Sequence, residues 1–249
     1  MKTLAVYNVK GGVGKTAAAV NLAYLAAQSG LHTVLWDLDP QGAATWYLRG
    51  DAAKAADKAV WRGTSPIGRR IVETPHHEHL HLIPADLDTR HLDVWLRKDD
   101  SSHDRLRRLI EPLSEQYSLV VLDCPPSLSH VADNIFGAAD RILVPTVPTH
   151  LSLRALMTLI EYFKTYDLPR GRLKPFWSMA DRRRGLHRGL IEQPPKTMRD
   201  VCAAVIPYAS TVERMGEHRG PVEAFEPSSV AAEAYRALWR ELSPSLKRP

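Results

Sequence analysis

The glycine-rich segment near the start of the chain constrains the fold more than any other stretch. It reads Val9-Lys10-Gly11-Gly12-Val13-Gly14-Lys15-Thr16. An apolar run at residues 4–7 precedes it, and an alanine-rich run at residues 17–27 follows it. Because glycine has no Cβ, consecutive backbone N–H groups can turn towards one anion, and the following helix adds the positive end of its dipole. The order of strand, glycine loop and helix predicts a phosphate-binding loop.

The polar side chains of this loop have different expected partners. Lys15 supplies a cation for the β- and γ-phosphates of a nucleotide, and the Thr16 hydroxyl can hold Mg²⁺. The plain motif has glycine at the position of Val9, and this chain offers a second lysine, Lys10, instead. The alternative is a glycine turn with two solvated lysines, and the flanking strand and helix patterns argue against it.

The loop resembles that of the deviant Walker ATPases of the ParA/MinD group, and within this group the ParA partition proteins. The resemblance implies a single α/β P-loop NTPase domain over residues 1–249, doubly wound, with a mostly parallel sheet, helices on both faces and a short tail at 243–249. It also implies ATP and Mg²⁺ as cofactors, slow partner-stimulated ATP hydrolysis, and an ATP-sandwich homodimer in which Lys10 reaches the other subunit's nucleotide. Ala17 stands where the family usually has a second threonine. The implied nucleotide contacts are Gly11, Gly12, Val13, Gly14, Lys15, Thr16 and Ala17.

Carboxylates follow the second predicted strand, residues 32–36. Asp37 and Asp39 stand at its carboxyl end, where ligands of open α/β sheets collect. The resemblance places the family's water-positioning carboxylate on Asp39. From chemistry alone, Asp39 is equally consistent with an N-cap for a helix over residues 41–47. Asp37 is a candidate for indirect support of the phosphates or of Mg²⁺.

A further buried strand is predicted where the apolar residues 119–122 lead to Asp123. A carboxylate at such a strand end suits Mg²⁺ held against phosphates, usually through water. The run Asp-Cys-Pro-Pro-Ser that starts there also resembles ParA sequences. A capping aspartate at a strand end is the alternative, which the phosphate loop upstream disfavours. Cys124 and Cys202 lie far apart in apolar runs, so we expect both in the core of a reduced, cytosolic protein.

Hydrophobic patterns predict the remaining elements. Pro194 and Pro195 should kink or interrupt one of the helices. The resemblance adds Met179 and Pro207 as cofactor contacts, because the family's last strand ends near the adenine. Helices are predicted over residues 15–28, 52–59, 103–115, 152–166, 187–202 and 231–242, and strands over 3–7, 80–84, 139–146, 173–179 and 204–207.

Several histidines between residues 76 and 81 raise the question of a metal site. His79 and His81 alternate with Leu80 and Leu82, which is the pattern of a half-exposed strand. Structural zinc sites usually bring cysteine or distinctly spaced histidine pairs. The pattern therefore favours a strand over a metal site.

The formal net charge of +5 favours acidic partners such as nucleic acid or anionic lipid. ParA proteins without an N-terminal helix-turn-helix extension bind DNA non-specifically as ATP dimers, and we expect this chain to lack that extension. Such binding needs only phosphate neutralisation by Lys and Arg. For any one arginine a merely solvated position is as plausible as a DNA contact. The candidates are Arg182, Arg183, Arg184, Arg188, Arg199, Arg214 and Arg219.

The resemblance and the charged residues together predict an ATP-driven positional switch. ATP closes a homodimer, the dimer binds double-stranded DNA non-specifically, and a ParB-like centromere-binding protein stimulates hydrolysis and release, which segregates a plasmid or chromosome. We expect a cytoplasmic, nucleoid-associated protein, because the sequence shows no signal peptide and no apolar run near the ~20 residues of a membrane span.

Other functions occur on the same fold. MinD-like membrane positioning requires an amphipathic C-terminal helix rich in lysine, and the run at 243–249 does not suit one, so no membrane partner is expected. Positioning of a protein cargo is a second alternative. A metabolic role, as in an iron protein, a cluster carrier or a small-molecule ligase, remains a third; a cluster would need a cysteine set at a shared interface.

Overall fold

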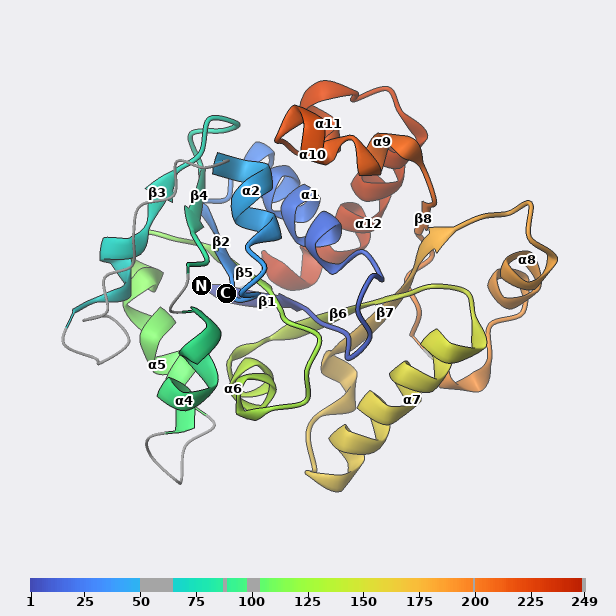
Figure 1. The fold of residues 1–249 in the computed structure, drawn as a ribbon, viewed down its shortest axis with the longest axis horizontal. Coiled ribbons are helices and arrows are strands. Elements are labelled where there is room, and N and C mark those ends of the chain that lie inside the picture. Colours follow the sequence, from blue (N-terminus) through green and yellow to red (C-terminus); the bar gives the residue numbers. More distant parts are fainter. Residues whose placement is uncertain (50–64, 87–88, 98–103, 199, 248–249) are drawn as a thin grey trace.

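The computed structural model describes residues 1–49, 65–86, 89–97, 104–198 and 200–247, and it centres on one sheet with helices on both faces (Figure 1). Among these residues the strand order is β3-β4-β2-β5-β1-β6-β7-β8. Neighbouring strands run parallel except β3, which is antiparallel to β4. This confirms the predicted fold class. The strands are β1 (Lys2–Val6), β2 (Thr33–Asp37), β3 (Val72–Glu73), β4 (Leu80–Ile83), β5 (Leu119–Asp123), β6 (Arg141–Thr146), β7 (Leu173–Ala180) and β8 (Val205–Pro207).

The central strand β1 lies between β5 and β6 and marks the point where the chain changes direction across the sheet. β2 to β5 all lie on one side of it and β6 to β8 on the other. Val6, the last residue of β1, pairs with Asp123 on one side and with Leu143 on the other. The loop after β1 therefore starts next to the carboxylate at the end of β5, at the switch point where open α/β sheets bind ligands.

One face of the sheet is covered by α1 (Lys15–Gln28), α2 (Ala43–Arg49) and α12 (Val230–Leu246). Leu4 and Val6 of β1 point into this core, where α1 is buried along almost its whole length. Its many alanines suit a helix packed against both the sheet and α12, because small side chains allow close approach. Three short helices lie beside this layer, namely α9 (Ser210–Glu213), α10 (Met215–His218) and α11 (Val222–Phe225).

The other face is covered by α4 (Leu92–Arg97), α5 (Arg105–Ile110), α6 (His130–Ala138) and α7 (His150–Thr165) (Figure 1). Ala5 of β1 and Tyr7 just after it point to this side, as the two-residue period of a strand requires. Phe136 of α6 forms an edge-to-face contact with Tyr7 at 4.9 Å between ring centroids. Between β7 and β8 the chain forms α8 (Gly185–Glu192), which begins after a short loop.

Two predicted helices end early, and in both cases proline gives the reason. The helix predicted over 187–202 is wrong beyond Glu192: α8 stops there, and only a 3₁₀ turn follows at Lys196–Met198. The helix predicted over 103–115 becomes α5 followed by a 3₁₀ turn at Glu111–Glu115, with Pro112 at its start. Proline has no N–H and clashes with the preceding turn, so an α-helix cannot continue through it without loss.

At the C-terminus the prediction of a tail from residue 243 is wrong. α12 continues to Leu246 with Pro244 inside it. Leu242 and Leu246 are both buried, 3% and 2% exposed, in the same core as α1. This burial offsets the hydrogen bond that Pro244 removes. Helix α6 was not predicted, although the Ser129 hydroxyl caps its start by accepting from Val131 N. The predicted helix at 52–59 lies outside the described residues.

If the last turn of α12 is part of the core, Leu246→Ala lowers the free energy of unfolding by about 2 kcal/mol, because it removes buried apolar surface. Lys247→Ala, at the neighbouring exposed position, is the matched control and leaves stability unchanged. Urea unfolding of the two variants measures the difference. Equal stability of both variants would mean that the turn is a solvated tail.

Candidate nucleotide-binding site

The glycine loop adopts the conformation that its sequence predicts. Gly12 and Gly14 have φ angles of 67° and 86°, in the left-handed region that favours glycine. Gly14 is also the N-cap residue of α1, and no side chain of the described residues caps that helix start. Its first N–H groups are therefore free to bind an anion, together with the positive end of the helix dipole.

Gly14 also lies against the end of β7. A Cβ at this position would come within 2.9 Å of Ser178 Oγ and 4.0 Å of Met179 Cγ. Around Gly11, by contrast, nothing lies within 4 Å of such a Cβ. The loop is thus tight on the side of β7 and open on the side where a ligand would enter.

Lys15 folds back into this loop. Its side chain is buried, and Nζ donates a hydrogen bond to the main-chain oxygen of Lys10 at 3.3 Å. Burial lowers the Lys15 pKa, whereas the nearby Asp123, Cys124 and Asp39 act in the opposite direction. The ammonium group is therefore held at the loop as the phosphate role requires, with a weak neutral partner that a phosphate oxygen would replace.

Asp123 lies at the end of β5 with no exposed surface, and neither carboxylate oxygen has a hydrogen-bond partner of normal geometry among the described residues. Burial, followed by the adjacent Asp37, raises the Asp123 pKa well above its usual value; the Thr16 hydroxyl and Lys15 oppose this shift. A buried carboxylate without a partner is costly unless a cation or donor satisfies it. Together with Thr16, an oxygen-donor set of this kind fits Mg²⁺, the metal predicted here.

Asp37 pairs in register with Asp123, but its carboxylate is satisfied by hydrogen bonds within the chain. Its carboxylate accepts hydrogen bonds from Thr45 N and Thr45 Oγ1, both at 2.8 Å, and from Asp39 N at 3.2 Å. Thr45 lies in the first turn of α2, so Asp37 ties the start of this helix to β2. Burial raises the Asp37 pKa to about 6, and its hydrogen bonds oppose that rise. These contacts identify Asp37 as a structural clamp rather than a direct metal ligand.

Asp39 forms a turn of its own. Oδ1 accepts from Gln41 N at 3.0 Å, and its carbonyl oxygen accepts from Gly42 N at 2.9 Å. Because α2 starts at Ala43, Asp39 does not cap the helix directly. The alternative of an N-cap is therefore wrong in detail, and Asp39 stands half-buried in the turn between β2 and α2. Its role with water stays a prediction.

Lys10 points away from its own loop. Nζ donates to Ser152 Oγ, in the first turn of α7, at 3.2 Å. Its backbone N–H donates to Asn8 Oδ1, and Asn8 Nδ2 donates to the carbonyl oxygen of Pro145. Two residues that contact Lys10, Asn8 and Ser152, were not predicted from the sequence. Asn8 adjoins the motif, whereas Ser152 lies 142 residues from Lys10 and has no local signal.

The two predicted cofactor contacts near the ends of the last strands, Met179 and Pro207, have different surroundings. Met179 has a φ of 53°, beside an irregularity in the pairing of β7 with β8, and its side chain lies next to Gly14. Pro207 ends β8 opposite Ala180. Met179 is therefore adjacent to the phosphate loop, and the adenine contact predicted for both residues stays a prediction.

The candidate DNA contacts fall into two groups. In the loop after β7, Arg183 binds the Asp181 carboxylate through Nε at 2.9 Å and Nη2 at 3.0 Å, and Arg184 lies 3.7 Å from it. Arg182 and Arg188 are exposed, and neither makes a hydrogen bond or ion pair through its side chain with a described residue. This leaves them available to a phosphate backbone.

The second group lies near α10 and is already engaged. Arg214 forms an ion pair with Glu226. The Arg219 guanidinium stacks 4.2 Å from the centre of the Trp46 ring of α2, a cation–π arrangement. Arg199 lies outside the described residues. The six described arginines are therefore divided between the loop after β7 with α8 and the two ends of α10.

The histidines follow the strand prediction. β4 alternates as expected, with half-buried His81 between buried Leu80 and Leu82. The rings of His32 and His79 lie 4.3 Å apart, yet in the part of the chain that the structure describes no group of three or more His, Cys, Asp or Glu side chains is placed to hold a metal ion. Both cysteines are buried and unpaired, in agreement with a core position. No helix of the described ranges has the length and apolar character to cross a membrane.

The left-handed φ and the close contact of Gly14 predict that Gly14→Ala strains the loop. We expect the free energy of unfolding to fall by about 1–3 kcal/mol and nucleotide binding to be lost. Gly11→Ala is the control for stability, because its Cβ meets open space. Thermal unfolding without nucleotide checks the first effect; equal melting temperatures for both variants would contradict it.

The loop after β7 is predicted to loosen in acid. Asp181 N donates to Nδ1 of buried His187 at 3.0 Å, so that nitrogen must be unprotonated. Burial, then the charge of Arg184, lowers the His187 pKa, while Asp181 opposes the shift. A lowered histidine pKa means that the contact is complete above about pH 6.5, the unfolded value, and is lost as the pH falls through the folded value.

Amide hydrogen exchange at residues 181–184, corrected for its intrinsic pH dependence, should therefore accelerate as the pH falls through the lowered pKa of His187. His187→Asn supplies a control, since its amide oxygen accepts at every pH, and should remove the pH dependence. The same pH dependence in both proteins would exclude His187 as the cause.

Comparison with known proteins identifies the family to which this fold and loop belong. A family model described as an AAA domain matches residues 1–170. The sporulation initiation inhibitor protein Soj of Bacillus subtilis is 30% identical over 97% of this chain and 98% of its own length. The chromosome partitioning protein ParA of Caulobacter vibrioides is 32% identical over 97% and 94%. Among solved structures, cobyrinic acid a,c-diamide synthase of Mycobacterium smegmatis, with a bound ATP analogue and magnesium, aligns with a TM-score of 0.80 and 25% identity over 99% of this chain and 96% of that one. The chain therefore belongs to the ParA/MinD family of P-loop ATPases.

Proposed function

We propose that this ATPase is an ATP-driven switch for DNA partition. ATP and Mg²⁺ close a homodimer, the dimer binds double-stranded DNA without sequence preference, and a ParB-like partner stimulates hydrolysis and release. The observation that carries the proposal is the opposite orientation of the two loop lysines. Lys15 lies within its own loop, whereas Lys10 leaves it and rests on Ser152 of α7, free to exchange that hydroxyl for a phosphate of a second subunit.

The residues at the site divide the work of hydrolysis. The N–H groups of residues 11–17 and the Lys15 ammonium bind the phosphates, and Thr16 and Asp123 hold Mg²⁺, the latter through water. When bound, Mg²⁺ supplies positive charge against the phosphate oxygens. Asp39 orients the attacking water from a turn that Asp37 anchors, and Lys10 of the other subunit stabilises charge on the transferred phosphoryl group.

The relatives support binding of ATP and Mg²⁺ and a role in partition. The M. smegmatis protein is bound to an ATP analogue and magnesium, which agrees with a buried Asp123 carboxylate that has no hydrogen-bond partner among the residues described in this chain. The B. subtilis and C. vibrioides relatives are a sporulation inhibitor and a chromosome partitioning protein. By analogy we propose a cytoplasmic, nucleoid-associated location for this protein.

For DNA we propose that Arg182 and Arg188 make the first phosphate contacts. They are exposed and make no side-chain hydrogen bond or ion pair within the described ranges, whereas Arg183, Arg214 and Arg219 already have partners. Non-specific binding needs only such phosphate neutralisation. MinD-like membrane positioning is less well supported, because Leu238, Trp239 and Leu242 of α12 are buried against the core rather than available to lipid.

The proposal predicts that duplex DNA retains the protein with ATP and Mg²⁺ and releases it without nucleotide. Lys10→Ala should abolish the ATP-dependent retention, because it removes the charge intended for the other subunit, while ATP binding to the single chain persists. Equal retention with and without ATP would overturn the switch.

The DNA surface is tested by the salt dependence of binding. For Arg182→Ala/Arg188→Ala the slope of log affinity against log salt should fall by about 2, one for each lost phosphate contact. Arg154→Ala/Arg170→Ala removes the same charge from exposed positions elsewhere and should leave the slope unchanged. An equal loss in both doubles would show only a general charge effect.

A further inference from the structure

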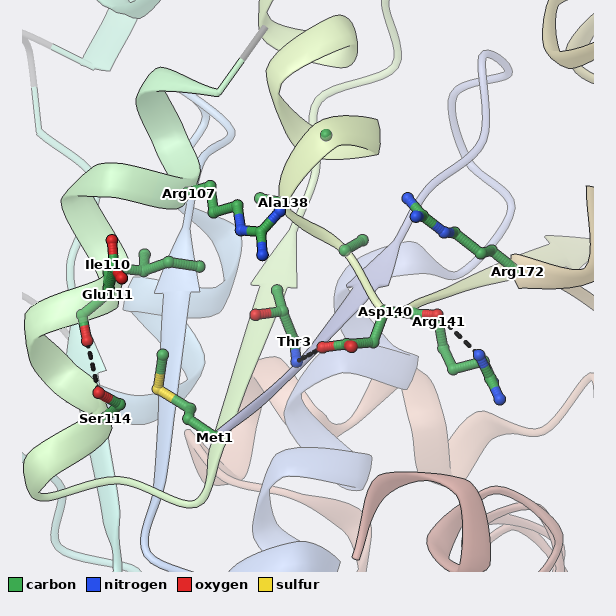
Figure 2. A pocket seen from close by; sticks show the side chains of 12 residues that line it. Met1, Thr3, Arg107, Ile110, Glu111, Ser114, Ala138, Asp140, Arg141 and Arg172 are labelled. Carbon is green, nitrogen blue, oxygen red and sulfur yellow. Dashed lines mark hydrogen bonds between the residues drawn. The ribbon is translucent and has the colours of Figure 1, made fainter. Parts of the chain in front are cut away.

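A second polar recess lies at the opposite edge of the sheet from the phosphate loop (Figure 2). It has a volume of about 380 Å³ and opens where β1 and β6 begin. Its walls come from α5 with the 3₁₀ turn after it, from the end of α6, and from Arg172 just before β7. The volume lies in the range of small-molecule sites, and no residue of the nucleotide site contributes to it.

Three arginines line this recess, namely Arg107, Arg141 and Arg172. Figure 2 shows Arg107 reaching from α5 and Arg172 from the opposite side, both towards the end of α6. The side chain of Arg107 is exposed and forms no hydrogen bond or ion pair with any described residue. Arg141, the first residue of β6, donates through Nη1 to the carbonyl oxygen of Asp140 at 2.9 Å, while its Nε is shielded from solvent and has no partner in the described part of the chain.

The acidic residues of the recess do not balance these donors. Asp140 is already used, because Oδ2 accepts from Thr3 N at 2.8 Å and Oδ1 lies 3.6 Å from Lys2 Nζ. Glu111 stands at the exposed rim. The recess therefore holds more hydrogen-bond donors and more positive charge than its own acceptors satisfy.

A purely structural role explains only part of this arrangement. Arg172 Nη1 donates to the carbonyl oxygen of Phe136 at 3.2 Å, which caps the last turn of α6 and complements the negative end of that helix. The same explanation does not reach Arg107 or the shielded Nε of Arg141, neither of which has an acceptor among the described residues. Both are therefore available to an acceptor that enters the recess.

We propose that this recess binds a phosphate-bearing small molecule, at a site separate from the nucleotide loop. A phosphate group carries several acceptor oxygens, so that it can receive hydrogen bonds from guanidinium groups on two walls at once, which suits Arg107 and Arg172. The Ser114 hydroxyl at the rim already donates to the carbonyl oxygen of Glu111 at 2.7 Å, so the arginines are the donors that the ligand would use. A recess of this size admits one small ligand.

The test is an amide NMR titration of the full ¹⁵N-labelled chain with inorganic phosphate, in the presence of ADP and Mg²⁺ to occupy the loop. We expect saturable shifts at Thr3, Ser114 and Asp140. Shifts confined to residues 10–17 would overturn the proposal, and so would the same shifts with sodium chloride at equal ionic strength.

A pair of variants on α5 decides whether the arginine binds the ligand. Arg107→Ala should weaken phosphate binding by about tenfold or more, the effect of losing one charge-assisted contact. Arg108→Ala, the adjacent exposed arginine that does not line the recess, should bind as the parent does. Equal affinities of the two variants would refute the assignment. If Arg107→Ala lost DNA retention and kept phosphate binding, the recess would instead belong to a nucleic-acid surface.

Discussion

The candidate site depends on two buried carboxylates that stand side by side at the ends of β2 and β5. Asp37 and Asp123 are in register and wholly buried. Among the described residues Asp37 has hydrogen-bond donors and Asp123 has none of normal geometry. Burial raises the pKa of both carboxyl groups, and the charge of Asp37 adds to the rise at Asp123. Removing two like charges from water in this way opposes folding. A site that keeps such an arrangement is built for a cation, and the Lys15 ammonium supplies only part of the compensating charge.

The donors of Asp37 also determine where Asp39 stands. Thr45 connects Asp37 to the segment after β4. Its N–H and hydroxyl donate to the Asp37 carboxylate, and its hydroxyl oxygen accepts a hydrogen bond from Ala85 N. The turn between β2 and α2 is therefore fastened at β2, at α2 and at the segment after β4. Asp39 occupies the middle of this turn, so its carboxylate is positioned by contacts that lie outside the site itself.

The features that depend only on neighbouring residues were predicted correctly from the sequence. The glycine loop, the bounds of α1 and the strand before Asp123 follow from glycine freedom and from apolar runs. The effect of proline on helix ends could not be predicted from local sequence alone. Pro112 and Pro194 follow the ends of α-helices, whereas Pro244 lies inside α12, where the burial of Leu246 beyond it compensates. Contacts between distant residues could not be predicted. Lys10 with Ser152 depends on how β1 and β6 pair, and Arg219 with Trp46 depends on how α10 packs against α2.

The close approach of Gly14 to Ser178 has a consequence for communication within the protein. Ser178 lies three residues before Asp181, whose carboxylate and backbone organise the arginine loop. Any change in the backbone at Gly14 therefore meets β7 directly. From that contact the chain leads within three residues to the Asp181 carboxylate that binds Arg183, so the phosphate loop and the arginine loop share one strand end.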